Sequence, residues 1–338
     1  MNIDLLDWFN PQTSARGSVL SHDITTNNWQ PSQRYPDPRI VSVETQFSSL
    51  VLPLAKVERI ATGFRWCEGP VWFGDTRQLI WSDVPGNCMY RWDEQSATTS
   101  IFRKPSKNGN GNTRDRQGRL LTCEHLNRRV VRTEYDGKLT VIADKYQGHR
   151  LNSPNDVICK SDGTIWFTDP EFGILGNYEG EIAQPELPTN VYYVGTDGSV
   201  NLAAEGINQP NGLAFSPDES TLYIVESRSS PRHILSYTVN ENNTLSNRSV
   251  FIDAGPKGTP DGFRLDVSGN LWCGWGMGED GLDGVHVFNS NGTLIGRIDL
   301  PERCANLCFG GLHRNRIFMA ASTSVYSLFV NTQGVAGG

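Results

Sequence analysis

The sequence predicts an all-β protein, a six-bladed β-propeller, and two observations support this prediction. The first is a repeated pattern: a small polar or acidic residue, an apolar run, a turn, and a second apolar run that ends 14 or 15 residues after the opening residue. The six opening residues are Glu68, Asn110, Asn155, Asn211, Asp261 and Asn306. The second observation is their spacing of 42 to 56 residues, which is typical of four short strands per repeat, or one blade.

The two ends of the sequence predict how the ring of blades closes. Residues 1–55 carry no copy of the repeat, and we expect them to form an N-terminal arm packed on the propeller, in which Leu5 to Phe9 could form a short helix. Residues 56–338 would form the propeller. The repeat that opens at Asn306 contains only three strand patterns, whereas an extra one, Val57 to Thr62, precedes the first repeat. That strand should complete the sixth blade and close the ring.

Within each repeat, the first hairpin should return to the end of the blade from which it started, near the central axis. The acids that close four of the hairpins should therefore lie around the same mouth as the opening residues: Asp83, Glu124, Asp169 and Glu226. The third repeat is lengthened by an insertion, residues 170–190, that begins just after Asp169. We expect this insertion to wall a pocket at the mouth, with 227–233 and 276–284 in equivalent positions.

The opening residues predict a cation site on the axis. Two carboxylates and four amides form an oxygen-rich ring, and oxygen ligands suit Ca²⁺ or Mg²⁺, with Mn²⁺ and Zn²⁺ as alternatives. Glu68 and Asp261 would be buried charges that repel each other unless something pairs with them. A cation would remove the conflict. Asn side chains also cap turns, so Asn110 and Asn306 have an equally good structural interpretation.

Charge and cysteine content limit the classes of function. A net charge of −7 argues against nucleic acid as a partner, and no apolar run approaches the length of a membrane span. No secretory signal is visible, and the seven cysteines are odd in number and lie mostly in apolar runs. Free thiols in a reducing compartment, the cytoplasm, are therefore expected. The GxGxxG pattern at 276–281 is followed by a strand pattern and not a helix, which argues against a dinucleotide site.

Several of these segments resemble the SMP-30/gluconolactonase family of six-bladed propellers. They are Glu68–Pro70, Asn152–Asp156, Trp166–Asp169, Gln209–Gly212 and Pro260–Gly262. Two more, Thr122–His125 and Asn127–Val130, resemble the bacterial gluconolactonase branch, and the similarity runs from about 57 to 330. The resemblance implies one divalent metal ion, with Ca²⁺ as the first choice. It also implies that the metal is held by Glu68, Asn155, Asn211 and Asp261.

The resemblance further implies hydrolysis of a sugar lactone, such as a gluconolactone or another aldonolactone. Water would attack a carbonyl that the metal polarises. Asp261 is our first choice for the base that accepts the water proton, and Asp169 and Glu124 are alternatives. The substrate would be a small molecule, and the oligomeric state stays open.

Polar residues near the mouth are the candidates for holding the sugar. Asn110, Asn152 and His125 would bind hydroxyl groups, and Glu124 would lie beside them. Some family members use an arginine two places before the residue that matches Asn155. This chain has Ser153 there, so Arg150 or His125 could substitute.

Two other functions remain open at this stage. Diisopropylfluorophosphatases and paraoxonases share the architecture, so a phosphotriesterase or another lactonase is possible. The polar ring favours a sugar over an organophosphate, whose pocket should be aromatic. The other alternative is a non-enzymatic Ca²⁺-binding propeller, which would need the ring but no substrate groups around it.

Overall fold

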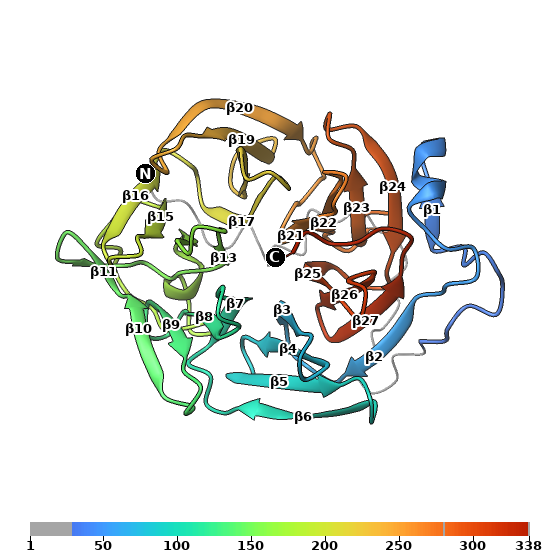
Figure 1. Ribbon diagram of the computed structural model, residues 1–338, viewed down its shortest axis with the longest axis horizontal. Coiled ribbons are helices and arrows are strands. Elements are labelled where there is room, and N and C mark those ends of the chain that lie inside the picture. The colour runs from blue at the N-terminus through green and yellow to red at the C-terminus, as the bar shows by residue number, and fades with distance from the viewer. Residues whose placement is uncertain (1–28, 280, 337–338) are drawn as a thin grey trace, which may run out of the picture. The chain divides into compact units, whose positions relative to one another are not determined.

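The structure of the protein is a computed structural model that describes residues 29–279 and 281–336 (Figure 1). The possible helix at Leu5 to Phe9, with the rest of residues 1–28, lies outside the described residues. No helix in the described ranges is long and apolar enough to cross a membrane.

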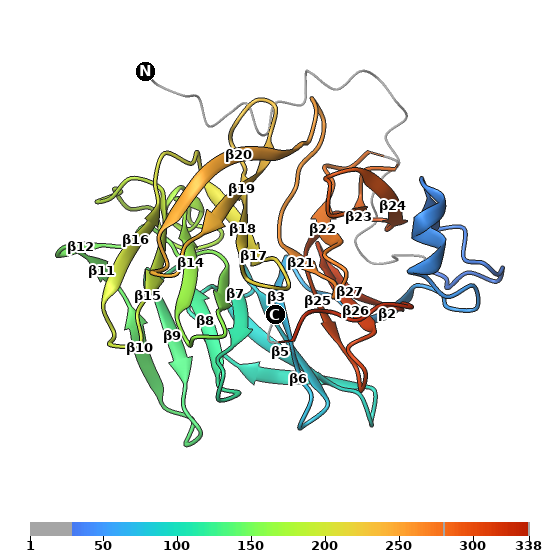
Figure 2. The ribbon, with the colours of Figure 1, turned by 45° about the horizontal axis from the view of Figure 1, so that its top comes forward.

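Six antiparallel sheets stand around a central axis, as predicted, and each is one blade (Figures 1 and 2). Their strands are given from the axis outward. Blade 1 has β3 (Cys67–Phe73), β4 (Gln78–Asp83), β5 (Cys88–Asp93) and β6 (Thr98–Arg103). Blade 2 has β7 (Gly109–Arg114), β8 (Leu120–Glu124), β9 (Arg129–Thr133) and β10 (Leu139–Ala143). Blade 3 has β13 (Val157–Cys159), β14 (Ile165–Asp169), β15 (Asn190–Val194) and β16 (Val200–Ala204).

The remaining blades follow the same order. Blade 4 has β17 (Pro210–Phe215), β18 (Thr221–Glu226), β19 (His233–Val239) and β20 (Leu245–Asp253). Blade 5 has β21 (Phe263–Leu265), β22 (Leu271–Trp275), β23 (Gly284–Phe288) and β24 (Leu294–Asp299). Blade 6 has β25 (Cys304–Gly310), β26 (Arg316–Ala321), β27 (Ser324–Phe329) and β2 (Glu58–Thr62). A separate hairpin, β11 (Lys145–Tyr146) with β12 (His149–Arg150), connects blades 2 and 3.

Blade 6 closes the ring in the predicted way. Its outer strand β2 comes from the N-terminal side of the chain and pairs antiparallel with β27, with Thr62 opposite Ser324. Pairing the first strand of the propeller with the last one satisfies the backbone groups of β27 that would otherwise form an open edge. The expected closing strand is therefore confirmed.

Residues 40–49, within the expected arm, pack on the outer edge of blade 5. Strand β1 (Ile40–Ser42) pairs with β24, and a 3₁₀ turn, η2 (Thr45–Ser49), follows it. Phe47 is fully buried there, with its ring 6.1 Å from that of Trp272. Gly296 makes room for it, since a Cβ at this position would lie 2.3 Å from the Phe47 ring.

The hydrophobic core lies between neighbouring blades. Between blades 2 and 3, for example, Leu121 and Val130 are buried against Phe167 and Tyr192. Burial of apolar surface at ~25 cal/mol per Å² is the main stabilising contribution of such contacts. All seven cysteines are buried and free, in agreement with the expected thiols.

Candidate active site

The six opening residues stand where the innermost strands begin, around the axis. Four lie within β3, β7, β17 and β25, and the other two stand two residues before the first residue of β13 and of β21; all six are at least nine-tenths buried. Neighbouring blades are tied together at this level. The amide nitrogen of Gly111 in blade 2 donates to the carbonyl oxygen of Asn155 in blade 3, at 2.8 Å. Across the join between blades 6 and 1, Asn306 Nδ2 donates to Glu68 Oε2 at 3.2 Å.

The local backbone explains why these side chains point inward. Strand pairing is interrupted by a register shift just after Glu68 and again between Pro210 and Leu213, and such bulges redirect side chains. A glycine follows four of the six openers, and the next blade passes close to it. A Cβ on Gly212 would lie 2.4 Å from the carbonyl oxygen of Asp261, so only glycine allows this approach.

Glu68 is a buried acid that forms no ion pair with a basic side chain in residues 29–279 or 281–336. Both of its hydrogen bonds fall on one oxygen, Oε2, from the backbone nitrogen of Gly69 at 2.9 Å and from Asn306. Burial raises the pKa of Glu68 well above its ordinary value, and the negative charges of Asp261 and Asp156 raise it further. The two ring carboxylates therefore interact, as expected for acids that converge on one axis.

Asp261 has one paired oxygen and one that is unpaired. Its Oδ2 accepts a hydrogen bond from Arg303 Nη2 at 2.5 Å, whereas its buried Oδ1 is within hydrogen-bond geometry of no donor in the described part of the chain. Burial raises the pKa of Asp261, although the Arg303 guanidinium and the amide of Asn211 act in the opposite direction. An acceptor left unpaired in a buried place costs about 1–3 kcal/mol, so a ligand bound to Oδ1 would be stabilising.

Asn110 is oriented by His125. The amide nitrogen Nδ2 of Asn110 lies 3.2 Å from His125 Nε2, and His125 Nδ1 lies 3.2 Å from the carbonyl oxygen of Glu179. A carbonyl can only accept, so Nδ1 carries the proton and Nε2 accepts from Asn110. This arrangement leaves Asn110 Oδ1 buried and without a partner, as a second unpaired oxygen of the ring.

The donor set suits a hard cation. The unpaired oxygen of Asp261, and the repulsion between Glu68 and Asp261, are what a divalent ion would satisfy. Within the described residues, no three His, Cys, Asp or Glu side chains gather in a metal-binding arrangement. A cation here would therefore need amide oxygens beside the two carboxylates. Asn155 and Asn211, at the openings of blades 3 and 4, are the amides that were predicted for this purpose.

Comparison with known proteins places the chain in a family. The sequence profile of the SMP-30/gluconolactonase/LRE-like region matches residues 66–323. The chain belongs to this family. It is 30% identical over 301 residues to a gluconolactonase of Zymomonas mobilis, covering 82% of both chains. It is 27% identical over 270 residues to a pentonolactonase of Haloferax volcanii, covering 78% of this chain and 84% of the relative. A solved gluconolactonase from Xanthomonas campestris, 35% identical, superimposes with a TM-score of 0.79 over 86% of this chain and 94% of that one.

In this member of the SMP-30/gluconolactonase family, the acids that close the hairpins cap loops. Asp83 Oδ1 accepts from the backbone nitrogens of Arg65 and Trp66, each at 3.2 Å. Asp169 accepts from the backbone nitrogens of Asn152 and Ser153 at 2.8 and 2.9 Å, one on each oxygen. Burial raises the pKa of Asp169 to about 7. With both oxygens engaged, Asp169 fits a structural role better than that of the alternative base.

Glu124 and Asn152 are buried, and most of their polar atoms form hydrogen bonds within the protein. Glu124 Oε2 accepts from Arg129 Nε at 2.7 Å and from Asn127 Nδ2 at 2.8 Å, whereas its Oε1 is unpaired. Asn152 Nδ2 donates to the carbonyl oxygen of Leu187 at 3.1 Å and so holds the far end of the insertion. Its Oδ1 is buried and has no partner, which leaves one group for a ligand.

Arg150 contacts the insertion and the loop after β8. It is exposed on β12, where its backbone nitrogen donates to Glu186 at 2.9 Å and its Nη2 donates to the carbonyl oxygen of Asn127 at 3.3 Å. Ser153 is committed to the insertion: its hydroxyl donates to the carbonyl oxygen of Pro170 at 2.7 Å. It also accepts from the backbone nitrogen of Gly173 at 2.9 Å. An arginine at 153 would have to displace this segment.

Sequence reasoning missed Arg303 and Glu179. Arg303 directly precedes β25, and a charged residue immediately before an innermost strand was the available signal. Glu179 lies in the insertion, and burial raises its pKa to about 7, with a further contribution from the charge of Asp261. Glu179 keeps part of its surface exposed, and it lies close enough to Asp261 and Arg303 for both charges to act on its carboxyl.

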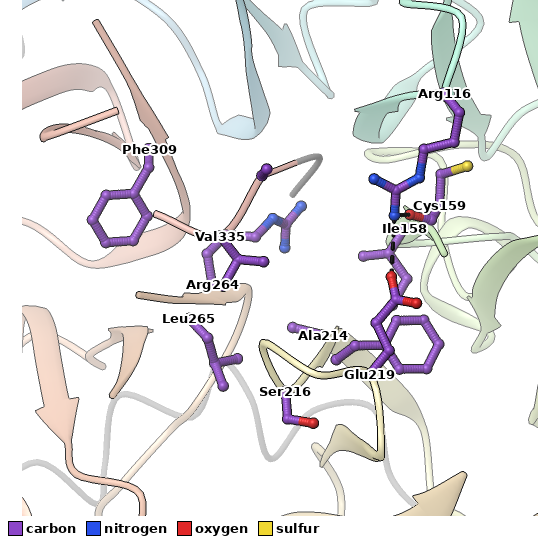
Figure 3. Close-up of a pocket in the computed structure, with 12 residues that line it drawn as sticks. Arg116, Ile158, Cys159, Ala214, Ser216, Glu219, Arg264, Leu265, Phe309 and Val335 are labelled. Atoms are coloured by element: carbon purple, nitrogen blue, oxygen red, sulfur yellow. Dashed lines mark hydrogen bonds and ion pairs between the residues drawn. The ribbon is translucent and has the colours of Figure 1, made fainter. Parts of the chain in front are cut away.

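A cavity of about 50 Å³ lies toward the other end of the blades (Figure 3). Its walls include Ile158, Phe215 and Leu265, which follow the ring positions by three or four residues along the innermost strands. At ~3.3 Å per residue, this separates the cavity from the ring by roughly 10–13 Å. Arg264 points into it in Figure 3, and its Nη1 lies 3.4 Å from Asp156 Oδ2. The cavity is therefore not the pocket of the ring.

Proposed function

We propose that this protein is a metal-dependent lactonase that hydrolyses a sugar lactone to the open-chain aldonic acid. The observation that carries the proposal is the buried pair Glu68 and Asp261, which repel each other while Asp261 Oδ1 lacks a partner. Family membership, and relatives named gluconolactonase and pentonolactonase, support the choice of a sugar lactone as substrate.

Glu68, Asn155, Asn211 and Asp261 would hold the metal ion, with Ca²⁺ as the first choice. When bound, such an ion supplies positive charge that polarises a lactone carbonyl. The chain itself supplies the remaining functions. Asp261 would hold the ion and, as the ligand beside the substrate, would also accept a proton from the attacking water.

The reaction balances with these groups alone. The water oxygen forms a bond to the carbonyl carbon, and one water proton passes to Asp261. The bond between the carbonyl carbon and the ring oxygen then breaks, and the ring oxygen takes up a proton to become a hydroxyl group. Asp261 is thereby returned to its starting state, and the new carboxylic acid ionises.

Polar atoms near the ring would bind the sugar. Asn110 Oδ1 is an unpaired acceptor suited to a sugar hydroxyl, and His125 holds the amide in that orientation. Burial lowers the pKa of His125 to about 4, so the imidazole is neutral at neutral pH and orients Asn110 without adding charge.

Rates of hydrolysis for a panel of substrates test this proposal. The full-length protein would be stripped of metal, and proton release would be followed by pH-stat with gluconolactone, a pentonolactone and the phosphotriester paraoxon. Each substrate would be assayed with Ca²⁺, Mg²⁺, Mn²⁺ or Zn²⁺ and without added metal. We expect lactone turnover only when a divalent ion is present. Full activity in a verified metal-free sample would contradict the metal requirement, and turnover of paraoxon alone would contradict the lactonase.

A further inference from the structure

Arg303 reaches across from blade 6 to the ring carboxylate of blade 5. Its Nη2 lies 2.5 Å from Asp261 Oδ2, and the two side chains are 16% and 6% exposed. Arg303 Nη1 lies 2.9 Å from the sulfur of Met277, and the guanidinium carbon lies 5.6 Å from the ring centroid of Trp66. Contacts on three sides thus hold the guanidinium beside the Asp261 carboxylate.

Holding Arg303 in this position costs free energy, because its charge is largely removed from water. A mostly buried ion pair regains little more than the cost of desolvation, and Arg303 Nε is buried with no hydrogen-bond partner among the residues that the structure describes. A guanidinium has five N–H groups, and the contacts to Asp261 and Met277 occupy one on each Nη atom. One further N–H on each Nη atom is therefore available, and the side chain keeps some exposure through which a ligand could reach it.

The position of these donors matches the charge that lactone hydrolysis develops. The reaction places negative charge on the carbonyl oxygen in the tetrahedral intermediate, and then on the carboxylate of the product. Both arise at the carbon that the water attacks, and Asp261 beside Arg303 is the group that would deprotonate that water. A planar guanidinium donates two parallel hydrogen bonds to a carboxylate, which a lysine ammonium cannot do.

We infer that Arg303 is a catalytic residue that donates hydrogen bonds to the oxyanion of the intermediate and to the carboxylate of the product. The inference rests on the proposed lactonase function, because it takes the acyl end of the lactone to lie beside Asp261. It adds to that function a residue that binds the anion, and it makes the aldonate product a ligand of the same guanidinium.

Two substitutions of Arg303 and one control test this inference. Arg303→Met removes the donors, and Arg303→Lys keeps the charge but not the paired geometry. The matched control is Arg119→Met, because Arg119 also pairs with an aspartate, Asp115, at 2.7 Å, but at the opposite end of blade 2 from Asn110. The measurements are kcat/KM for gluconolactone, inhibition by gluconate, and gluconate binding by calorimetry, on variants with native circular dichroism.

We expect Arg303→Met to lower kcat/KM by ~10²–10³, the usual effect of losing one oxyanion donor. Gluconate binding should weaken by at least ~10-fold, since a charge-assisted hydrogen bond contributes roughly 1.5–3 kcal/mol. Arg303→Lys should recover only part of either loss, and Arg119→Met should match the wild type. If Arg303 merely neutralises Asp261, Arg303→Lys will restore kcat/KM fully and Arg303→Met will bind gluconate normally. Either result would overturn the inference.

The calorimetry separates this inference from the proposed function. If the wild type hydrolyses no lactone but binds gluconate through Arg303, the lactonase proposal fails and the anion site at Arg303 stands. If the wild type hydrolyses lactones and folded Arg303→Met does so equally well, the lactonase stands and the role of Arg303 is refuted.

Discussion

His125 shows how one buried side chain can set the polarity of its neighbours. It is fully buried, accepts from Asn110 and donates to the backbone of the insertion, so only the neutral tautomer with a proton on Nδ1 satisfies both contacts. A protonated ring would turn Nε2 into a donor facing the Asn110 amide. Asn110 would then have to turn its oxygen away from the mouth, and the ring would lose an acceptor.

Protonation of His125 should make the stability of the fold depend on pH. The folded pKa of His125, about 4, lies below its ordinary value of 6.5, so its contribution is complete above pH 6.5 and is lost as pH falls toward 4. The wild type should lose about 2 kcal/mol of unfolding free energy between pH 7 and pH 5 from this group. His125→Gln should lack that part of the loss in urea denaturation at the two pH values. The exposed His313, changed to Gln, is the control. Equal losses in the wild type and His125→Gln would contradict the account.

The insertion between β14 and β15 is the element that distinguishes this mouth. It begins with Pro170, includes the 3₁₀ turn η3 (Phe172–Ile174), and is fastened at both ends to residues that precede the opener Asn155. Its middle contacts His125 through the carbonyl oxygen of Glu179. These contacts fix it beside the ring, where the sequence had predicted a pocket wall.

Shortening this insertion should change how the protein handles its substrates. Replacing residues 174–184 with a short turn keeps the anchors at Pro170 and Leu187 but removes Glu179. We expect KM or the range of accepted lactones to change, while calcium affinity measured by calorimetry stays nearly the same, because none of the proposed metal ligands lies in the segment. Unchanged kinetics for every lactone in the panel would show that the segment is not part of the pocket.

At the scale of the whole molecule, the repeat in the sequence was enough to predict the blades and their closure. A blade is built from hairpins between strands that are close in sequence. Its strands and turns therefore produce a repeat that is visible in a single sequence. The β1 strand was not predicted, because three residues paired to the outside of β24 carry no periodic signal. The sequence likewise did not predict that β1 and Phe47 would extend blade 5.

The candidate site was predictable only in part, for a related reason. The opening residues could be located because each repeat supplies one of them at a fixed position. The ion pair of Arg303 with Asp261 joins residues 42 positions apart in adjacent blades, and it depends on side-chain directions that no local pattern records. The same limit explains Arg150, which is near the opener Asn155 in sequence but lies exposed on a separate hairpin.

We propose that the ring carboxylates take part in lactone hydrolysis and do not only hold the blades together. The most direct test is turnover of gluconolactone by Asp261→Asn at saturating calcium, at a temperature where its circular dichroism is native. The amide keeps the shape of the side chain but can neither carry the charge nor accept the water proton. The fold should survive, because the core lies between the blades, away from the axis. We expect a loss of ~10²–10³ in turnover by the folded variant. Wild-type turnover by that variant would contradict the account.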